Sequence, residues 1–170
     1  MKKLLSLFLA LMMVFSLVNV GFASSAATIN GWSGNYSVEA YSGRDAAVKI
    51  SNSAAVLDPA MSFSGVVMLT ADVYASSGGT ISLEDGSGNQ AGVITLADGK
   101  INGTQTSYSV DGWNTLKIFA MTGIKKYQVY LGDTFVCEAD TTKNVIPSLA
   151  EFSSSGDIYV DNVSINQMEK

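Results

Sequence analysis

The chain has 170 residues and a formal net charge of −5, from 10 Lys and Arg residues against 15 Asp and Glu residues. An acidic chain without a basic patch does not suit nucleic acid or an anionic membrane surface, because neither partner would gain from charge attraction. The chain contains no His, which excludes Ser-His-Asp and Cys-His catalytic centres and an ordinary His-ligated zinc or copper site.

The N-terminal segment predicts export. Lys2 and Lys3 precede an almost wholly apolar run over residues 4–20, and small residues around Ala23 occupy the positions that a signal peptidase reads. We therefore predict a helical signal peptide over residues 1–23 and secretion from a bacterial cell. A retained membrane anchor is the alternative, because the apolar run is nearly long enough to span a bilayer. The C-terminal end has no apolar tail, so no stable membrane anchor is expected there.

Residues 24–170 are expected to form one domain, which is long enough for a core between two sheets. Cys137 is the single cysteine, so no internal disulfide can form and the apolar core has to provide the stability. We interpret Cys137 as a small buried hydrophobic residue, with a reactive thiol as the alternative.

Short apolar runs with a period of two alternate with Asn-Gly and Asp-Gly turns along the whole domain. This rhythm, without helical periodicity, predicts an all-β fold of two antiparallel sheets packed as a β-sandwich. A jelly roll is the expected topology, because it places the first and last strands side by side. The predicted strands cover residues 36–41, 46–50, 66–74, 80–84, 91–96, 100–101, 113–120, 127–131, 134–139, 149–152 and 157–165.

Three segments of the C-terminal part resemble one large superfamily. Trp113-Asn-Thr-Leu-Lys-Ile118, residues 126–133 and residues 156–163 resemble strands of the concanavalin A-like, laminin-G-like jelly-roll domains of secreted bacterial proteins. Near the N-terminus, Gly31-Trp32 and residues 42–50 are similar to the opening of jelly-roll carbohydrate-binding modules of the family 4 and 9 type. Both resemblances imply a jelly roll. Neither implies an activity, because these folds host lectins, glycanases, lyases and adhesive domains.

The residues do not favour catalysis. A glycosidase of this fold would need two carboxylates across a cleft, and the E-x-D-x-x-E strand of the superfamily's glucanases is missing. A lyase of this fold normally uses His, Tyr and Arg or Gln, whereas this chain has no His and Arg44 is its single arginine. A glycan-cleaving enzyme that depends on carboxylates therefore stays the less favoured alternative.

Carbohydrate binding needs only exposed aromatic rings beside short polar side chains. Three of the predicted strands place such residues opposite their core face, and they would line one concave face if the strands share a sheet. The candidate ligand-binding residues are Asp72, Tyr74, Lys117, Phe119, Gln128 and Tyr130. Alternatively, Phe119 and Tyr130 only pack across neighbouring strands. Trp113 is expected to enter the core where its strand begins, and Trp32 is similar, although its glycine-rich setting leaves loop exposure open.

Calcium is the one cofactor that the resemblance implies, because jelly-roll binding modules often tie their first and last strands with it. The implied ligands are Asp161 of the closing strand and Glu39 or Asp45 of the opening strands. The alternative is that Asp161 and Asn162 hydrogen-bond to the backbone at a β-bulge.

The sequence thus predicts a secreted, non-catalytic β-sandwich that binds a poly- or oligosaccharide. A structural or adhesive matrix protein is the alternative, in which exposed strand edges would serve self-association.

Overall fold

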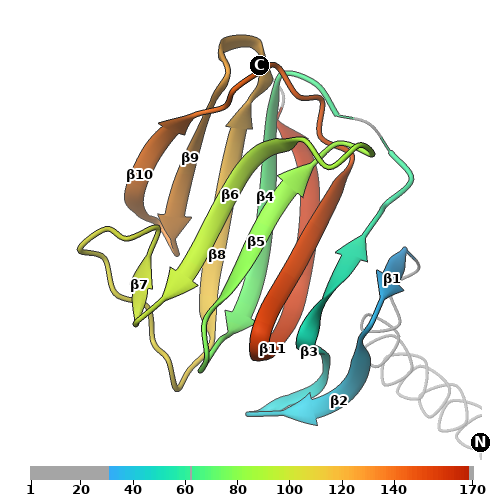
Figure 1. Ribbon diagram of the computed structural model, residues 1–170, viewed down its shortest axis with the longest axis vertical. Helices are drawn as coiled ribbons and strands as arrows, with labels where there is room; N and C mark the ends of the chain where they lie inside the picture. The colour runs from blue at the N-terminus through green and yellow to red at the C-terminus, as the bar shows by residue number, and fades with distance from the viewer. Residues whose placement is uncertain (1–30, 62, 169–170) are drawn as a thin grey trace, which may run out of the picture.

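The computed structural model describes residues 31–61 and 63–168, so the predicted signal peptide lies outside the described residues. The described chain consists of antiparallel strands and one short 3-10 helix, η1 (Figure 1), which confirms the predicted all-β class. The elements are β1 (Trp32–Gly34), β2 (Ser37–Tyr41), β3 (Arg44–Leu57), β4 (Val66–Tyr74), β5 (Gly79–Glu84), β6 (Gln90–Ala97), β7 (Lys100–Ile101), β8 (Asn114–Met121), η1 (Thr122–Ile124), β9 (Lys126–Leu131), β10 (Thr134–Asp140) and β11 (Leu149–Met168). Among these residues no helix is long and apolar enough to cross a membrane.

The strands form two layers. The larger sheet has the order β10-β9-β8-β4, continued by the second part of β11, the first part of β3 and then β2. The smaller sheet has the order β7-β6-β5, continued by the first part of β11, the second part of β3 and then β1. The two layers pack face to face, with β6 against β8 and β9 (Figure 1).

Two long strands belong to both layers. The first part of β11, residues 149–153, pairs with β5, and residues 159–168 pair with β4. The change of layer occurs between Ser154 and Asp157, where the pairing register with β3 shifts, and Figure 1 shows the two arms of β11 on either side of this bend. At the bend, a Cβ atom on Gly156 would lie 2.6 Å from the Cβ of Ser77, so a larger residue would clash. The two strands predicted over 149–152 and 157–165 are therefore one bent strand.

The core lies between the layers and follows the predicted alternation. Val67, Leu69, Ala71 and Val73 of β4 are at most 1% exposed. They face the layer that carries Phe152, which is fully buried. Each large apolar side chain buried in this way contributes about 1.5–3 kcal/mol to folding.

Several details differ from the sequence prediction. β1 was missed, because its three residues are too few to show a period of two. β3 extends to Leu57, since residues 51–55 are all small or polar and show little hydrophobic contrast. The closing strand β11 lies beside β3 and not beside the first strand, so β1 and β2 form one edge of the sandwich. Cys137 is only half-buried, although it packs against the core.

Candidate functional site

The outer face of the larger sheet contains all six residues that the sequence predicted for the ligand-binding face. β4, β8 and β9 are neighbours, and their register aligns the outward residues in rows across the sheet. In one row Thr70 of β4 faces Lys117, which faces Tyr130, and in the next Met68 faces Phe119. The prediction that these strands share a sheet is confirmed. Whether the residues bind a ligand remains a prediction.

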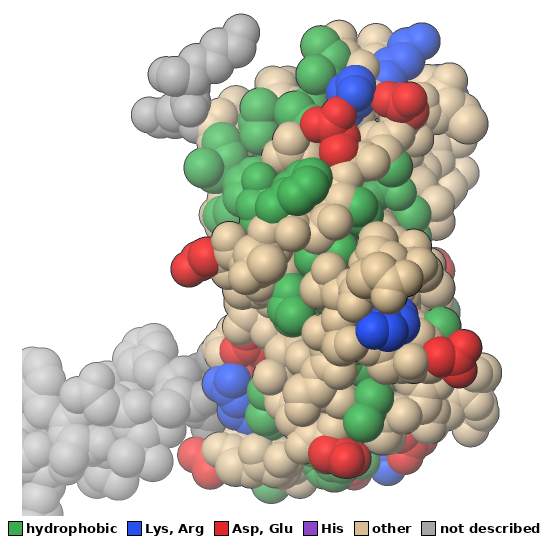
Figure 2. Space-filling view, turned by 90° about the vertical axis from the view of Figure 1, so that its left-hand side faces the viewer, with side chains coloured by type: hydrophobic (Ala, Val, Ile, Leu, Met, Phe, Trp, Pro, Cys, Tyr) green, Lys and Arg blue, Asp and Glu red, His purple; other side chains and the backbone are tan. Residues whose placement is uncertain are grey.

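One end of this face carries a row of three aromatic rings, which we call the aromatic file: Phe119, Tyr130 and Phe135. The ring centroids of Phe119 and Tyr130 lie 5.1 Å apart, and those of Tyr130 and Phe135 lie 5.6 Å apart, both in edge-to-face geometry. Phe119 and Tyr130 therefore do pack across neighbouring strands, as the alternative held. Phe135 continues the file to the edge strand and is 52% exposed. Figure 2 looks onto the side of the molecule that carries the β10 edge, and it shows hydrophobic side chains gathered in the upper part of that side, with acidic and basic side chains nearby.

Polar groups flank the aromatic file. The hydroxyl group of Tyr130 donates to Gln128 Oε1 over 3.1 Å, and Gln128 Nε2 donates to Glu138 over 3.0 Å. Lys126 Nζ lies 2.5 Å from Glu138 Oε1. Hydrogen bonds from Lys126 and Gln128 lower the pKa of Glu138, so this carboxylate is ionised at neutral pH. The file thus has donors, acceptors and both charge signs beside it on the same face of the sheet.

The other end of the face contains a polar network that we call the Arg44 clasp: Arg44, Asp72, Thr115, Asp161 and Asn162. Arg44 Nη2 lies 2.8 Å from Asp72 Oδ2, and Arg44 Nη1 lies 3.4 Å from Asp161 Oδ2. Thr115 Oγ1 donates to Asp72 over 2.6 Å, and Asn162 Nδ2 donates to it over 2.8 Å. Burial alone would raise the pKa of Asp72, but the hydrogen bonds from Thr115 and Asn162 and the charge of Arg44 together lower it.

Aromatic rings surround the clasp. The Arg44 guanidinium lies 5.1 Å from the centroid of the Trp113 ring, in a cation–π contact. Tyr74 contacts Trp113 edge-to-face at 5.9 Å and Tyr41 at 5.0 Å, and Tyr41 stacks on Tyr159 with centroids 3.5 Å apart. The expectation that Trp113 enters the core is wrong. Its ring lies on the outer face, and its Nε1 donates to the carbonyl oxygen of Ser42 in the β2–β3 turn.

The six predicted residues therefore divide between the two ends. Asp72 and Tyr74 belong to the surroundings of Arg44, whereas Phe119, Gln128 and Tyr130 belong to the aromatic file. Lys117 lies beside the file and pairs with Asp133 over 2.7 Å.

The three carboxylates implied as calcium ligands do not form one cluster. Asp161 pairs with Arg44, Glu39 pairs with Lys49 at 3.5 Å, and Asp45 is exposed on β3. Over residues 31–61 and 63–168, no group of three or more His, Cys, Asp or Glu side chains could hold a metal ion. The guanidinium group of Arg44 is the cation that connects the opening strands to the closing strand here. The three implied carboxylates therefore do not form a set of ligands that fits calcium. Calcium binding stays a prediction without support from this geometry.

The bulge expected as the alternative role of the Asp-Asn step is present. The register between β11 and β4 shifts between Asp161 and Ser164. Asn162 has a φ of 50°, and its backbone NH donates to Asp161 Oδ1 over 2.8 Å. The positive φ turns the Asn162 side chain toward Asp72, where it completes the clasp.

Sequence reasoning missed several residues of this face. Phe135 could have been found, because the two-residue Gly132-Asp133 turn fixes the pairing of Phe135 with Tyr130. Arg44 entered the sequence analysis only as a candidate lyase residue. It contacts Asp72, which lies 28 residues away in the chain, and no local sequence pattern indicates such a contact.

The trace of the chain is similar to several solved structures. A sialidase shares 13% sequence identity at a TM-score of 0.64, and the match covers 84% of this chain and 18% of the sialidase chain. The carbohydrate-binding module CBM66 from Bacillus subtilis shares 14% identity at a TM-score of 0.55, covering 81% of this chain and 96% of the module. An alginate lyase of polysaccharide lyase family 7 shares 15% identity at a TM-score of 0.55, covering 77% of this chain and 81% of the lyase.

No family model matches the sequence, and no curated protein matches it. This chain spans less than a fifth of the sialidase that it resembles. At these identities the likenesses establish the architecture alone, and they confirm the predicted fold: the chain is a jelly-roll β-sandwich.

Proposed function

We propose that the protein is a secreted, non-catalytic β-sandwich that binds a poly- or oligosaccharide on the outer face of the larger sheet. The observation that carries the proposal is the aromatic file, with the half-exposed ring of Phe135 at its open end. A sugar ring presents an apolar face of C–H groups that stacks on such a ring and hydroxyl groups that need polar partners.

The polar partners lie next to the rings. Gln128, Glu138 and Lys126 form a hydrogen-bonded chain on the same face as Tyr130 and Phe135. Exposed ion pairs and amides of this kind can exchange their bonds for sugar hydroxyls at small cost, because solvent already competes for them. The likeness to a carbohydrate-binding module supports the proposal at the level of the fold.

The carboxylates of this face do not suit acid–base chemistry. A glycosidase needs one carboxyl group with a raised pKa as the general acid. Asp72 has a lowered pKa, and both it and Asp161 are bound to Arg44. The pairing of Asp72 with Arg44 supports binding without glycosidase chemistry at the clasp.

The test measures binding to insoluble polysaccharides by pull-down and to soluble ones by affinity electrophoresis. We expect Phe135→Ala to weaken glycan binding by about tenfold, because the sugar loses the ring on which its apolar face stacks, and aromatic contacts contribute about 0.5–1.5 kcal/mol beyond the area that they bury. Tyr130→Ala and Phe119→Ala should weaken it as well.

Ile146→Ala is the matched control, because Ile146 is 59% exposed but lies in the loop between β10 and β11. It should bind like the wild type. Unchanged binding by all three aromatic variants would move the glycan site away from this face.

The structural or adhesive alternative makes a different prediction. β10 is an edge strand, but its register with β9 shifts between Phe135 and Cys137, and such an irregularity hinders pairing with another chain. Self-association through this edge would show as a concentration-dependent mass in analytical ultracentrifugation, and it would persist in the absence of any glycan.

A further inference from the structure

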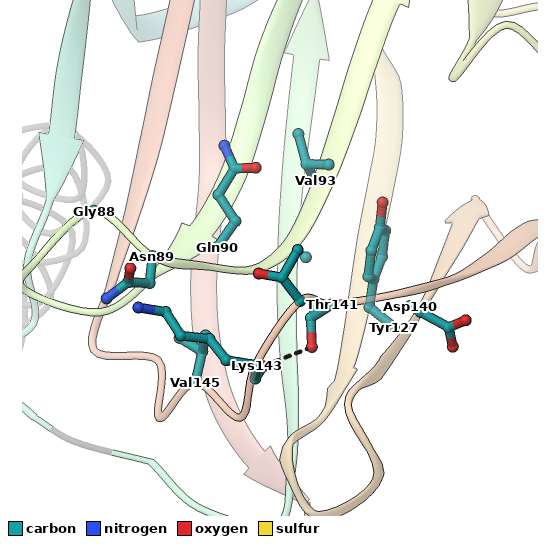
Figure 3. Close-up of a pocket in the computed structure, with 11 residues that line it drawn as sticks. Gly88, Asn89, Gln90, Val93, Tyr127, Asp140, Thr141, Lys143 and Val145 are labelled. Carbon is teal, nitrogen blue, oxygen red and sulfur yellow. Dashed lines mark hydrogen bonds between the residues drawn. The ribbon is translucent and has the colours of Figure 1, made fainter.

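A cavity of about 310 Å³ opens beside strands β6 and β9 (Figure 3). It lies apart from the outer face that carries the aromatic file. Its walls come from the β5–β6 turn, from β6 and β9, and from the loop that follows β10. A volume of this size is at the small end of ligand pockets, so it suits one sugar ring rather than a chain.

The inner wall of the cavity is apolar except for one hydroxyl group. Tyr127 is only 8% exposed, and Val145 is 4% exposed. Burial raises the pKa of Tyr127, so its hydroxyl group keeps its proton and can donate. Tyr127 and Val145 both line the cavity. A buried aromatic ring in the wall of a cavity offers an apolar surface against which a sugar ring can lie.

The rim of the cavity carries the positive charge. Lys143 extends across it toward Asn89 in Figure 3, and over residues 31–61 and 63–168 it forms no ion pair. By contrast, Lys49, Lys117 and Lys126 are all paired with carboxylates. The rim also carries the amides of Asn89 and Gln90 and the hydroxyl group of Thr141.

Two carboxylates near the rim are already engaged. Asp85 accepts hydrogen bonds from the backbone of Ser87 and Asn89 and from Asn89 Nδ2, although Lys143 is near enough to lower its pKa. Asp140 lines the cavity but extends away from Lys143 in Figure 3 and lies 3.8 Å from Lys126 Nζ. The cation of Lys143 is therefore the charge that an incoming ligand would meet.

We propose that this cavity is a second binding site, which takes a single carboxylated sugar residue such as a uronate. The carboxylate would pair with Lys143, the sugar ring would lie against Tyr127 and Val145, and its hydroxyls would meet the amides of Asn89 and Gln90. One ammonium group with neutral donors matches a singly charged carboxylate, whereas phosphate sites typically collect several cations or an Arg fork.

The test titrates the protein with sodium glucuronate, and with glucose and sodium acetate as probes of the ring and the carboxylate alone, by calorimetry or by amide chemical shifts. We expect glucuronate to bind at least about tenfold more tightly than glucose or acetate. Lys143→Gln should lower the affinity for glucuronate by about tenfold, because a charge-assisted hydrogen bond is lost. Lys143→Arg should retain the binding, and Tyr127→Phe should weaken it.

Lys100→Gln is the control for net charge, because this substitution removes the same charge as Lys143→Gln. Lys100 lies on β7, which pairs with the end of β6 that is far from the cavity. It should bind glucuronate like the wild type, as should Phe135→Ala, which affects the proposed glycan face alone. Equal affinities for glucuronate and glucose, or an unchanged affinity in Lys143→Gln, would overturn the proposal. Loss of glucuronate binding in Phe135→Ala would place the uronate on the aromatic file instead.

Discussion

The two ends of the larger sheet's outer face contain similar residue types but arrange them differently. At the Arg44 clasp, Asp72 has a side chain that is only 13% exposed and receives three partners. Beside the aromatic file, Asp133 pairs with Lys117 while 99% of its side chain is exposed. The same kind of ion pair is thus enclosed at one end and solvated at the other. The difference indicates that the clasp contributes to stability, whereas the file remains accessible to a ligand.

The largest effect is expected when the enclosed carboxylate is removed. Asp72→Ala should lower the free energy of unfolding by about 2–3 kcal/mol, because Arg44 loses its closer partner and two further hydrogen bonds are lost. Asp133→Ala makes the same change in a solvated pair and should leave stability almost unchanged. Urea unfolding of both variants measures the contrast. Equal losses in the two variants would contradict the assignment of different roles to the two ends.

The pH dependence of stability sharpens the same comparison. The folded state lowers the pKa of Asp72 below its ordinary value of 3.8. Its contribution is therefore fully present above that value and is lost as the pH falls through the lower folded pKa. We expect the difference in unfolding free energy between the wild type and Asp72→Ala to be constant near neutral pH and to shrink below about pH 4. This difference between the wild type and Asp72→Ala cancels the contributions of the other carboxylates with lowered pKa values, such as Asp85 and Asp157, because both proteins contain them.

The smallest expected effect concerns calcium. Because Arg44 already neutralises Asp72 and Asp161, the thermal midpoint of the wild type should be the same in excess calcium chloride and in EDTA. Arg44→Ala leaves the two carboxylates facing each other without a cation, and its midpoint should become sensitive to calcium. A wild-type midpoint that rises in calcium would show that the clasp is not the only cation site at this end, and would revive the calcium tie implied by the resemblance.

The period of two predicted most of the fold because it reports burial directly. The bounds of β4 and β7 agree with the prediction to the residue. Alternation fails where burial contrast is weak, as over residues 51–55 of β3, and where one strand belongs to both layers, as β11 does. Alternation says which way a side chain points, but it does not say which sheet the strand joins.

The candidate site was predictable only in part. Alternation placed Phe119 and Tyr130 on the outer face, and the hairpin turn could have added Phe135. The Arg44 clasp depends on strands that are far apart in the sequence, so no local pattern could join Arg44 to Asp72 and Asp161. The cavity at Tyr127 depends on how the β5–β6 turn and the loop after β10 lie beside β6 and β9, which the spacing of residues along one strand does not record.

The bent strand β11 has a consequence for how the chain acquires its structure during translation. It pairs with β3, β4 and β5, so it lies at the centre of both layers, yet it is the last of the described strands to be synthesised. Contacts between segments so distant in sequence slow folding, because the intervening chain has to be ordered before they form. The growing polypeptide therefore cannot complete either layer until β11 has left the ribosome.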